Sequence, residues 1–115
     1  QLLATHFGGQ VGPASHREFG LAAVDVVAPG DLFAGLPGSL RAWASHGDTV
    51  TEAPPGFEVV ATSANAPISA MQSRDRQVYG LLFHPEVAHT EHGAELLRNF
   101  AFGVCGCHGD WTMAA

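Results

Sequence analysis

The sequence has no lysine and only five arginines, and charged residues make up 14% of its 115 residues. Eleven acidic residues leave a formal net charge of −6, so the chain has no basic patch to neutralise phosphates. This argues against nucleic acids and anionic membranes as partners. No apolar run approaches the ~20 residues of a membrane-spanning helix, and no segment resembles a signal peptide. The two cysteines, Cys105 and Cys107, cannot form a disulfide framework, which is typical of a reducing, cytoplasmic setting.

Hydrophobic residues make up 46% of the chain, which is enough for one domain with a modest core. A folded chain of this length buries about 65% of the surface of its unfolded state. The charged fraction lies well below the roughly 25% of an ordinary soluble domain. We therefore expect part of the surface to contact another segment or chain. The start at Gln1 rather than methionine suggests a piece of a longer protein.

Residue patterns predict an α/β fold with a strand-rich centre and a helix at each end. Apolar residues at helical spacing before Gly8 predict the end of a helix over residues 1–7. Strands are expected over 21–27, 40–44, 57–62, 68–72 and 78–83, with a turn-like segment over 31–38 and a polar loop at Ser45-His46-Gly47-Asp48. An amphipathic helix is predicted over 91–104, with Thr90 as N-cap and one apolar face formed by Leu96, Leu97, Phe100, Ala101 and Val104.

The segment Tyr79–Glu86 combines a predicted buried strand with a histidine and a glutamate at its carboxyl end. Pro85 fixes its own φ and favours an extended conformation at His84. Residues i and i+2 of an extended segment point to the same side, so the Glu86 carboxylate can lie beside the His84 imidazole. A carboxylate there holds the tautomer of the ring and stabilises its protonated form, as in a catalytic triad. Without further context, such a spacing is more often a strand-ending turn with a solvated carboxylate.

The run Phe83-His84-Pro85-Glu86-Val87 resembles the His/Glu signature of class I glutamine amidotransferases, in which a cysteine from an upstream strand-turn-helix elbow attacks the side-chain amide of glutamine. Further matches narrow the resemblance to the glutaminase domain of the GMP synthases and extend it over essentially the whole chain. They are His16-Arg17-Glu18-Phe19-Gly20, Ser45-His46-Gly47-Asp48, Asn65-Ala66-Pro67, His89-Thr90, Leu97-Arg98-Asn99-Phe100 and the segment Cys105–Met113. The resemblance implies the C-terminal half of a flavodoxin-like amidotransferase domain over residues 1–105, with the start of a linker over 106–115.

The same resemblance implies that several parts of the enzyme lie outside this chain. The family's elbow reads Gly-x-Cys-x-Gly-x-Gln-Leu, and Gln1-Leu2-Leu3 matches only its tail, so the nucleophilic cysteine and the oxyanion donors would precede Gln1. An ATP-pyrophosphatase (synthetase) domain, with ATP and Mg²⁺ as cofactors, and a dimerisation domain would follow. We therefore expect no cofactor or metal in this segment, and no activity of the segment alone. The implied partners are glutamine, the synthetase domain of the same chain and a second copy of the protein.

By resemblance, His84 is the general base that takes the proton of the cysteine thiol, and Glu86 orients it. Gln1 and the pair Ser45 and His46 line the site for the α-amino and α-carboxylate groups of glutamine. Hydrolysis through a thioester would supply ammonia for the ATP-dependent amination of xanthosine monophosphate to GMP. From the residues alone, Gln1 can equally be an exposed terminal residue, and Ser45-His46-Gly47-Asp48 a plain hydrogen-bonded turn.

Other candidate residues have simpler interpretations. Cys105 and Cys107, together with His89, His92 and His108, are the ligand types of a zinc site, but the Cys-x-Cys-His spacing favours a helix-ending turn with buried thiols. A nucleophilic role for either thiol is disfavoured, because the family places its cysteine ahead of the His/Glu pair. Arg17-Glu18 would contact the synthetase domain or form a surface ion pair of little energetic weight. The alternative functions are another class I amidotransferase or γ-glutamyl hydrolase, and a non-catalytic module with the same fold.

Overall fold

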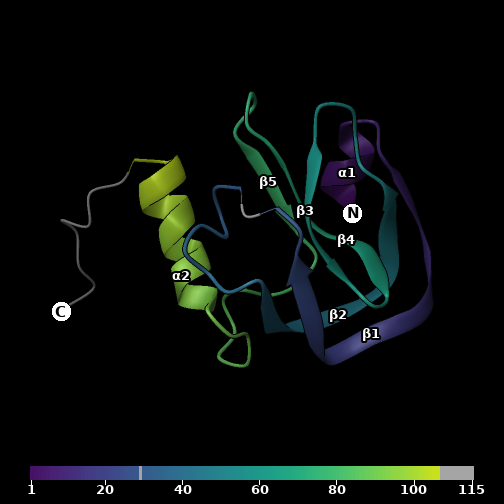
Figure 1. Ribbon diagram of the computed structural model, residues 1–115. Coiled ribbons are helices and arrows are strands. Elements are labelled where there is room, and N and C mark those ends of the chain that lie inside the picture. The colour runs from purple at the N-terminus through teal and green to yellow at the C-terminus, as the bar shows by residue number, and fades with distance from the viewer. Residues whose placement is uncertain (29, 107–115) are drawn as a thin grey trace, which may run out of the picture.

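The computed structural model describes residues 1–28 and 30–106, with the side chains of residues 14–18 outside the description. Along the chain it contains α1 (Leu2–His6), β1 (Gln10–Val26), β2 (Ser39–Glu52), β3 (Glu58–Ser63), β4 (Ala66–Ser73), β5 (Val78–Leu81), α2 (Gly93–Arg98) and the π-helical turn η1 (Asn99–Val104) (Figure 1). Within these residues the strands form one antiparallel sheet in the order β2-β1-β3-β4-β5. The expected α/β class, with strands at the centre and a helix at each end, is confirmed. No helix in the described ranges is long and apolar enough to cross a membrane.

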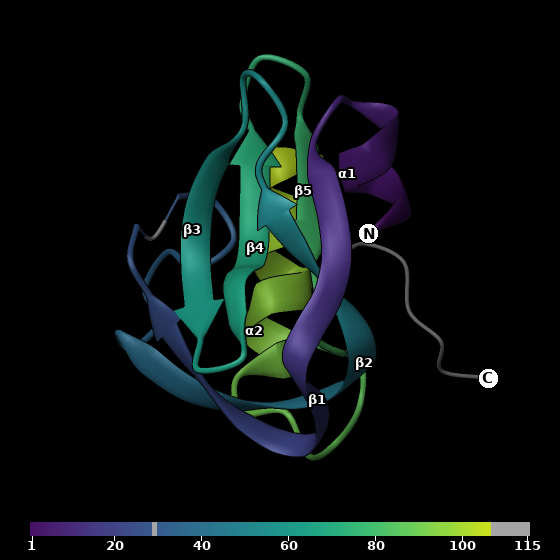
Figure 2. The same ribbon diagram turned by 90° about the vertical axis from the view of Figure 1, so that its right-hand side faces the viewer.

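β1 and β2 form the longest pairing of the sheet, and in Figure 2 they curve together round the lower ends of β3 and β4. β1 begins at Gln10 and is therefore much longer than the strand expected over 21–27. Its register with β2 is irregular between Pro13 and Glu18. Such an irregularity bends a strand and increases its twist, which agrees with the curvature of this pair of strands.

The polar loop expected at Ser45-His46-Gly47-Asp48 is wrong, because β2 continues through these residues. His46 lies opposite Glu18, and Asp48 lies opposite Pro13, in the neighbouring strand. Pairing with β1 gives these peptide groups hydrogen-bond partners, and this long-range effect outweighs the local turn preference of the residues. Successive residues of a strand point to opposite faces, so Ser45 is exposed whereas His46 is buried.

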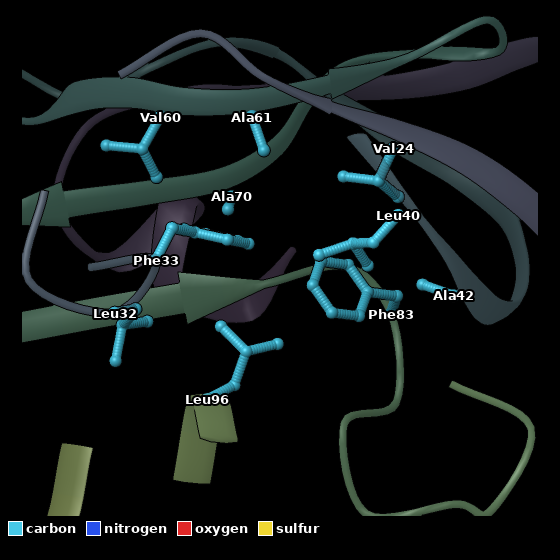
Figure 3. Close-up of a cluster of buried hydrophobic side chains, with 10 residues drawn as sticks. All are labelled: Val24, Leu32, Phe33, Leu40, Ala42, Val60, Ala61, Ala70, Phe83 and Leu96. Atoms are coloured by element: carbon cyan, nitrogen blue, oxygen red, sulfur yellow. The ribbon is translucent and has the colours of Figure 1, made fainter. Parts of the chain in front are cut away.

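The main core lies between the sheet and α2 (Figure 3). Its two largest fully buried side chains are Phe33, from the segment before β2, and Leu96, from α2. In Figure 3, Leu96 points from the helix toward Phe33 and Phe83. The other buried members are Val24, Leu32, Leu40, Ala42, Val60, Ala61 and Ala70. A second cluster, formed by Ala4, Val50, Ile68 and Met71, packs α1 against the sheet.

The C-terminal helix begins later than expected. Its N-cap is His92, which has a left-handed φ of 58°, and the expected N-cap at Thr90 is wrong. The next residue is Gly93, where a Cβ would clash with the carbonyl oxygen of Pro85. Glycine at this position therefore lets the first turn of α2 lie directly against the segment that carries His84 and Glu86.

The apolar face predicted for the helix is only partly buried. Leu96 is 2% exposed, whereas Leu97 and Phe100 are 47% and 40% exposed. After Arg98 the chain continues as the π-helical turn η1, which departs from the period of 3.6 residues on which the predicted face rests. In the described part of the chain, Leu96 is thus the buried apolar anchor of α2.

We expect Leu96→Ala to lower the free energy of unfolding by about 2–5 kcal/mol, because it leaves a cavity in the main core. Leu97→Ala is the matched control in the same helix, and we expect it to change this free energy by less than about 1 kcal/mol. Urea unfolding of the two variants measures the difference. A cost of similar size for both substitutions would contradict the packing of α2 described above.

Tyr79 connects β5 to the segment that precedes β2. Its hydroxyl donates a hydrogen bond of 2.6 Å to Oδ2 of Asp31, and Nε of Arg74 lies 3.8 Å from the same oxygen. Burial of the hydroxyl, together with its hydrogen bond to the Asp31 carboxylate, raises the pKa of Tyr79 from 10.0 to about 12. The folded protein therefore holds the phenolic proton more tightly than the unfolded chain does.

This difference predicts a pH dependence of stability. The contribution of Tyr79 is fully present below the unfolded-state pKa of 10.0 and is lost as the pH rises toward about 12, because the unfolded chain releases the proton first. Tyr79→Phe, which does not titrate, should flatten the fall in unfolding free energy over this range. Urea unfolding at a series of alkaline pH values tests this, and an equally steep fall in the variant would contradict it.

Candidate active site

His84 lies where the two outer strands of the sheet meet. After β5, the N–H of Leu82 donates to the carbonyl of Ser69 in β4 at 2.9 Å, and the N–H of His84 donates to the carbonyl of Trp43 in β2, also at 2.9 Å. His84 and Trp43 form an antiparallel bridge, and Phe83 beside them is 5% exposed in the core. The segment after β5 thus crosses from β4 to β2 and links the last strand of the sheet order to the first.

Two residues of the following turn, Thr90 and Glu91, hold the edge of β2 against the His84 segment. Oγ1 of Thr90 accepts a hydrogen bond of 2.9 Å from the N–H of Trp43 and donates one of 2.6 Å to the carbonyl of His84. The N–H of Glu91 donates to the carbonyl of Arg41 at 2.8 Å, and Oε1 of Glu91 accepts from the N–H of Arg41 at 2.7 Å. The edge-strand backbone groups of Arg41 and Trp43 therefore all find partners in this segment.

The side chains of His84 and Glu86 point toward each other from this anchored backbone. Nδ1 of His84 lies 3.3 Å from Oε2 of Glu86, and the two side chains are 50% and 57% exposed. An ionised carboxylate only accepts hydrogen bonds, so this contact favours a proton on Nδ1 and leaves Nε2 as the proton acceptor. The pair can act as an oriented general base that is accessible from outside the fold.

Gln1 and His46 meet at the carbonyl oxygen of Asp48 in β2. Nε2 of Gln1 donates to this oxygen at 3.1 Å, and Nδ1 of His46 lies 2.9 Å from it. A carbonyl oxygen only accepts, so Nδ1 of His46 carries a proton in this arrangement. The structure thus brings Gln1 and His46 together and places Ser45 on the opposite face of β2.

A cavity of about 260 Å³ lies between α1 and the strands β4 and β5. Gln1 and Leu3 line it on the helix side, and Ser69 and Leu82 line it on the sheet side. Leu82 precedes His84 by two residues and donates the hydrogen bond that begins the crossing to β2. The start of α1 and the segment that leads to His84 therefore border the same hollow.

The cysteines are only partly covered by the structure. Cys105 is exposed after η1, so the expectation of a buried thiol at this position is wrong. Cys107 and His108 lie outside the described residues, as do the side chains of Arg17 and Glu18. Among the residues that the structure describes, no group of three His, Cys, Asp or Glu side chains is arranged to hold a metal ion.

The two other described histidines of the C-terminal region, His89 and His92, each contact another side chain. The ring of His89 lies beside the ring of Trp43, with 5.1 Å between their centroids. Nδ1 of His92 contacts the Glu95 carboxylate within α2. Trp43, Thr90 and Glu91 shape the site although the sequence pattern assigns them no role in it. The motif His89-Thr90 is the sequence signal that could have drawn attention to Thr90.

A family model described as glutamine amidotransferase class-I matches residues 1–104. The chain belongs to the class I glutamine amidotransferases. Over 113 residues it is 56% identical to the GMP synthase [glutamine-hydrolyzing] of Listeria innocua and 50% identical to that of Enterococcus faecalis. Each alignment covers 98% of this chain and 22% of the relative, so this amidotransferase chain spans about a fifth of the length of these curated relatives.

Solved structures share the fold of this amidotransferase. A protein from Thermoplasma acidophilum, named as part of a GMP synthase, matches with a TM-score of 0.87 at 38% identity, over 92% of this chain and 53% of that one. A glutamine amidotransferase from Thermotoga maritima matches with a TM-score of 0.70 at 26% identity, over 92% of this chain and 43% of that one. The fold is thus that of a part of the class I amidotransferase domain.

We expect Gly93→Ala to lower the free energy of unfolding by about 1–3 kcal/mol, because the new Cβ would overlap the carbonyl of Pro85 and push the His84 segment outward. Gly103→Ala is the control within η1, since its Cβ would meet no described heavy atom within 4 Å outside its own helical turn. We expect this control to leave stability unchanged or to raise it slightly. Urea unfolding and the imidazole NMR signals of His84 test both effects, and equal results for the two variants would contradict the close contact at Gly93.

Proposed function

We propose that this chain is the C-terminal half of the glutaminase domain of a GMP synthase. In this proposal His84 is the general base and Glu86 the orienting carboxylate of a Cys-His-Glu triad. The observation that carries it is the 3.3 Å contact between the two side chains, on a segment whose backbone is anchored to β2. The identity of 50–56% to curated GMP synthases supports this choice among the amidotransferases.

The proposal places the nucleophilic cysteine ahead of Gln1 in a longer protein. A free thiol has a pKa of about 8.5 and is only a few per cent ionised at neutral pH, so it needs a base. Nε2 of His84 takes the thiol proton, while Glu86 stabilises the imidazolium through the proton on Nδ1. Formation of the thiolate thus depends on Glu86 holding the His84 imidazole in the correct orientation.

The reaction then follows from these roles. The thiolate attacks the side-chain carbonyl carbon of glutamine, and the C–N bond breaks as the imidazolium of His84 gives its proton to the departing nitrogen. Ammonia leaves and a γ-glutamyl thioester remains. A water molecule that loses a proton to His84 cleaves the thioester, which yields glutamate and restores the thiol.

In this proposal the α-amino and α-carboxylate groups of the substrate bind beside Gln1 and the part of β2 that contains Ser45 and His46. The carbonyl of Asp48 accepts hydrogen bonds from both Gln1 and His46, which occupy its two lone pairs and hold these side chains together, so we propose the side-chain oxygen of Gln1 as the acceptor for the α-ammonium group. The nearby cavity of about 260 Å³ supports the same location. Because Ser45 faces away from His46, we assign the contact to His46 and the strand backbone rather than to both side chains together.

The remaining steps belong to the longer protein. We propose that ammonia passes to a synthetase domain of the same chain, which uses ATP and Mg²⁺ to aminate xanthosine monophosphate to GMP. Dimerisation through a further domain and a cytoplasmic location are part of this proposal. The 22% share that this chain covers of the relatives named GMP synthase supports only the first part of this proposal, a longer protein with further domains.

We expect His84→Ala in the full-length protein to lower the rate of glutamine hydrolysis by about 10²–10⁴-fold, the usual contribution of a general base. GMP synthesis with ammonia supplied directly should keep its rate, because it does not need the thioester. His6→Ala, at an exposed histidine of α1, is the control and should leave both rates unchanged.

Assays of glutamate release and of GMP formation from each nitrogen source distinguish the outcomes. Glutamine hydrolysis at the unmodified rate in His84→Ala would show that another group is the base. If the parent protein hydrolyses glutamine but forms no GMP from either nitrogen source, the amidotransferase role stands and the assignment to GMP synthesis is wrong.

A further inference from the structure

The hydroxyl of Thr90 lies next to the backbone of His84 and has no role in the mechanism proposed above. Thr90 is 7% exposed, and its Oγ1 lies between two backbone groups from distant parts of the chain. It accepts from the N–H of Trp43 at 2.9 Å and donates to the carbonyl of His84 at 2.6 Å. Only a hydroxyl supplies a donor and an acceptor at a single atom, so serine is the one aliphatic residue that could replace it in both roles.

This hydroxyl completes an antiparallel residue pair. In a regular hydrogen-bonded pair the two residues exchange both N–H···O bonds. Here the N–H of His84 bonds directly to the carbonyl of Trp43 at 2.9 Å, whereas the return path from the N–H of Trp43 to the carbonyl of His84 passes through Thr90. Both backbone polar groups of His84 are thereby fixed, which sets the direction of its Cα–Cβ bond.

The hydroxyl does not serve the helix that follows. α2 has His92 as N-cap, and no side chain caps its first turn. Thr90 is also no part of the two apolar clusters that pack the helices. Both hydrogen bonds of its hydroxyl therefore connect β2 to His84.

We infer that Thr90 is a positioning residue for His84: through the relay from Trp43 it holds the imidazole where it can meet both Glu86 and the incoming thiol. This inference rests on the proposed role of His84 as the base. Without the hydroxyl, the N–H of Trp43 and the carbonyl of His84 lose a shared partner, and the peptide unit after His84 can rotate. A displacement of about 1 Å at a catalytic group can cost about 100-fold in rate.

The test uses the full-length enzyme with three variants. Thr90→Val removes the hydroxyl and keeps the shape, and Thr90→Ser keeps the hydroxyl. Thr49→Val is the matched control, because Thr49 is 4% exposed and its Oγ1 has no hydrogen-bond partner among the described residues. Glutamine hydrolysis, GMP synthesis from ammonia and thermal unfolding are measured for each variant.

We expect Thr90→Val to lower kcat for glutamine hydrolysis by about 10- to 100-fold, with KM and ammonia-dependent synthesis nearly unchanged. Thr90→Ser should restore kcat to within about 3-fold, and Thr49→Val should have no effect, because only the first variant removes the relay. In a His84→Ala background, Thr90→Val should lower the residual rate no further, since a positioning residue acts through the group that it positions.

Three results would overturn the inference: a folded Thr90→Val variant with unmodified kcat, equal losses in the Val and Ser variants, or a full additional loss in the His84→Ala background. Should Thr90→Val not fold, Thr90→Ala takes its place in the same comparison with Ser, and an unmodified kcat in that folded variant would be equally decisive. A parent enzyme without glutaminase activity, or an unimpaired His84→Ala variant, would contradict the proposed function instead.

Discussion

The site depends on the edge of β2 at Arg41 and Trp43, where the backbone groups that face away from β1 need hydrogen-bond partners. An edge strand leaves backbone N–H and C=O groups that must find partners when they are covered. Here the partners are the N–H groups of His84 and Glu91 and the side-chain oxygens of Thr90 and Glu91. The turn after β5 thus takes the place of another strand and joins the two outer strands of the sheet.

This junction explains how half-exposed side chains can be held in a defined geometry. Phe83 is buried in the main core beside His84, and Gly93 lets the first turn of α2 press against Pro85. The backbone of the segment is therefore fixed from the sheet side and from the helix side. Glu86 is then free to meet the imidazole without being buried itself, and the imidazole stays accessible to a substrate.

The sequence predicts the features that depend on neighbouring residues. The extended His84-Pro85-Glu86 geometry follows from proline and from the two-residue period of a strand, and the strands over 57–62 and 68–72 lie close to their observed bounds. The errors at Ser45–Asp48 and at Thr90 concern contacts between distant residues. Ser45–Asp48 are held in β2 by β1, and the hydroxyl of Thr90 bonds to a residue 47 positions away, which no local pattern contains.

Amide hydrogen exchange of the intact protein measures whether the His84 segment is anchored to β2, because the N–H groups of His84 and Glu91 donate to this strand at 2.9 and 2.8 Å. Both amides should exchange as slowly as those in the middle of the sheet, although they belong to a turn. Exchange at the rate of an open loop would show that the segment is not anchored, and the orientation of His84 would then need another cause.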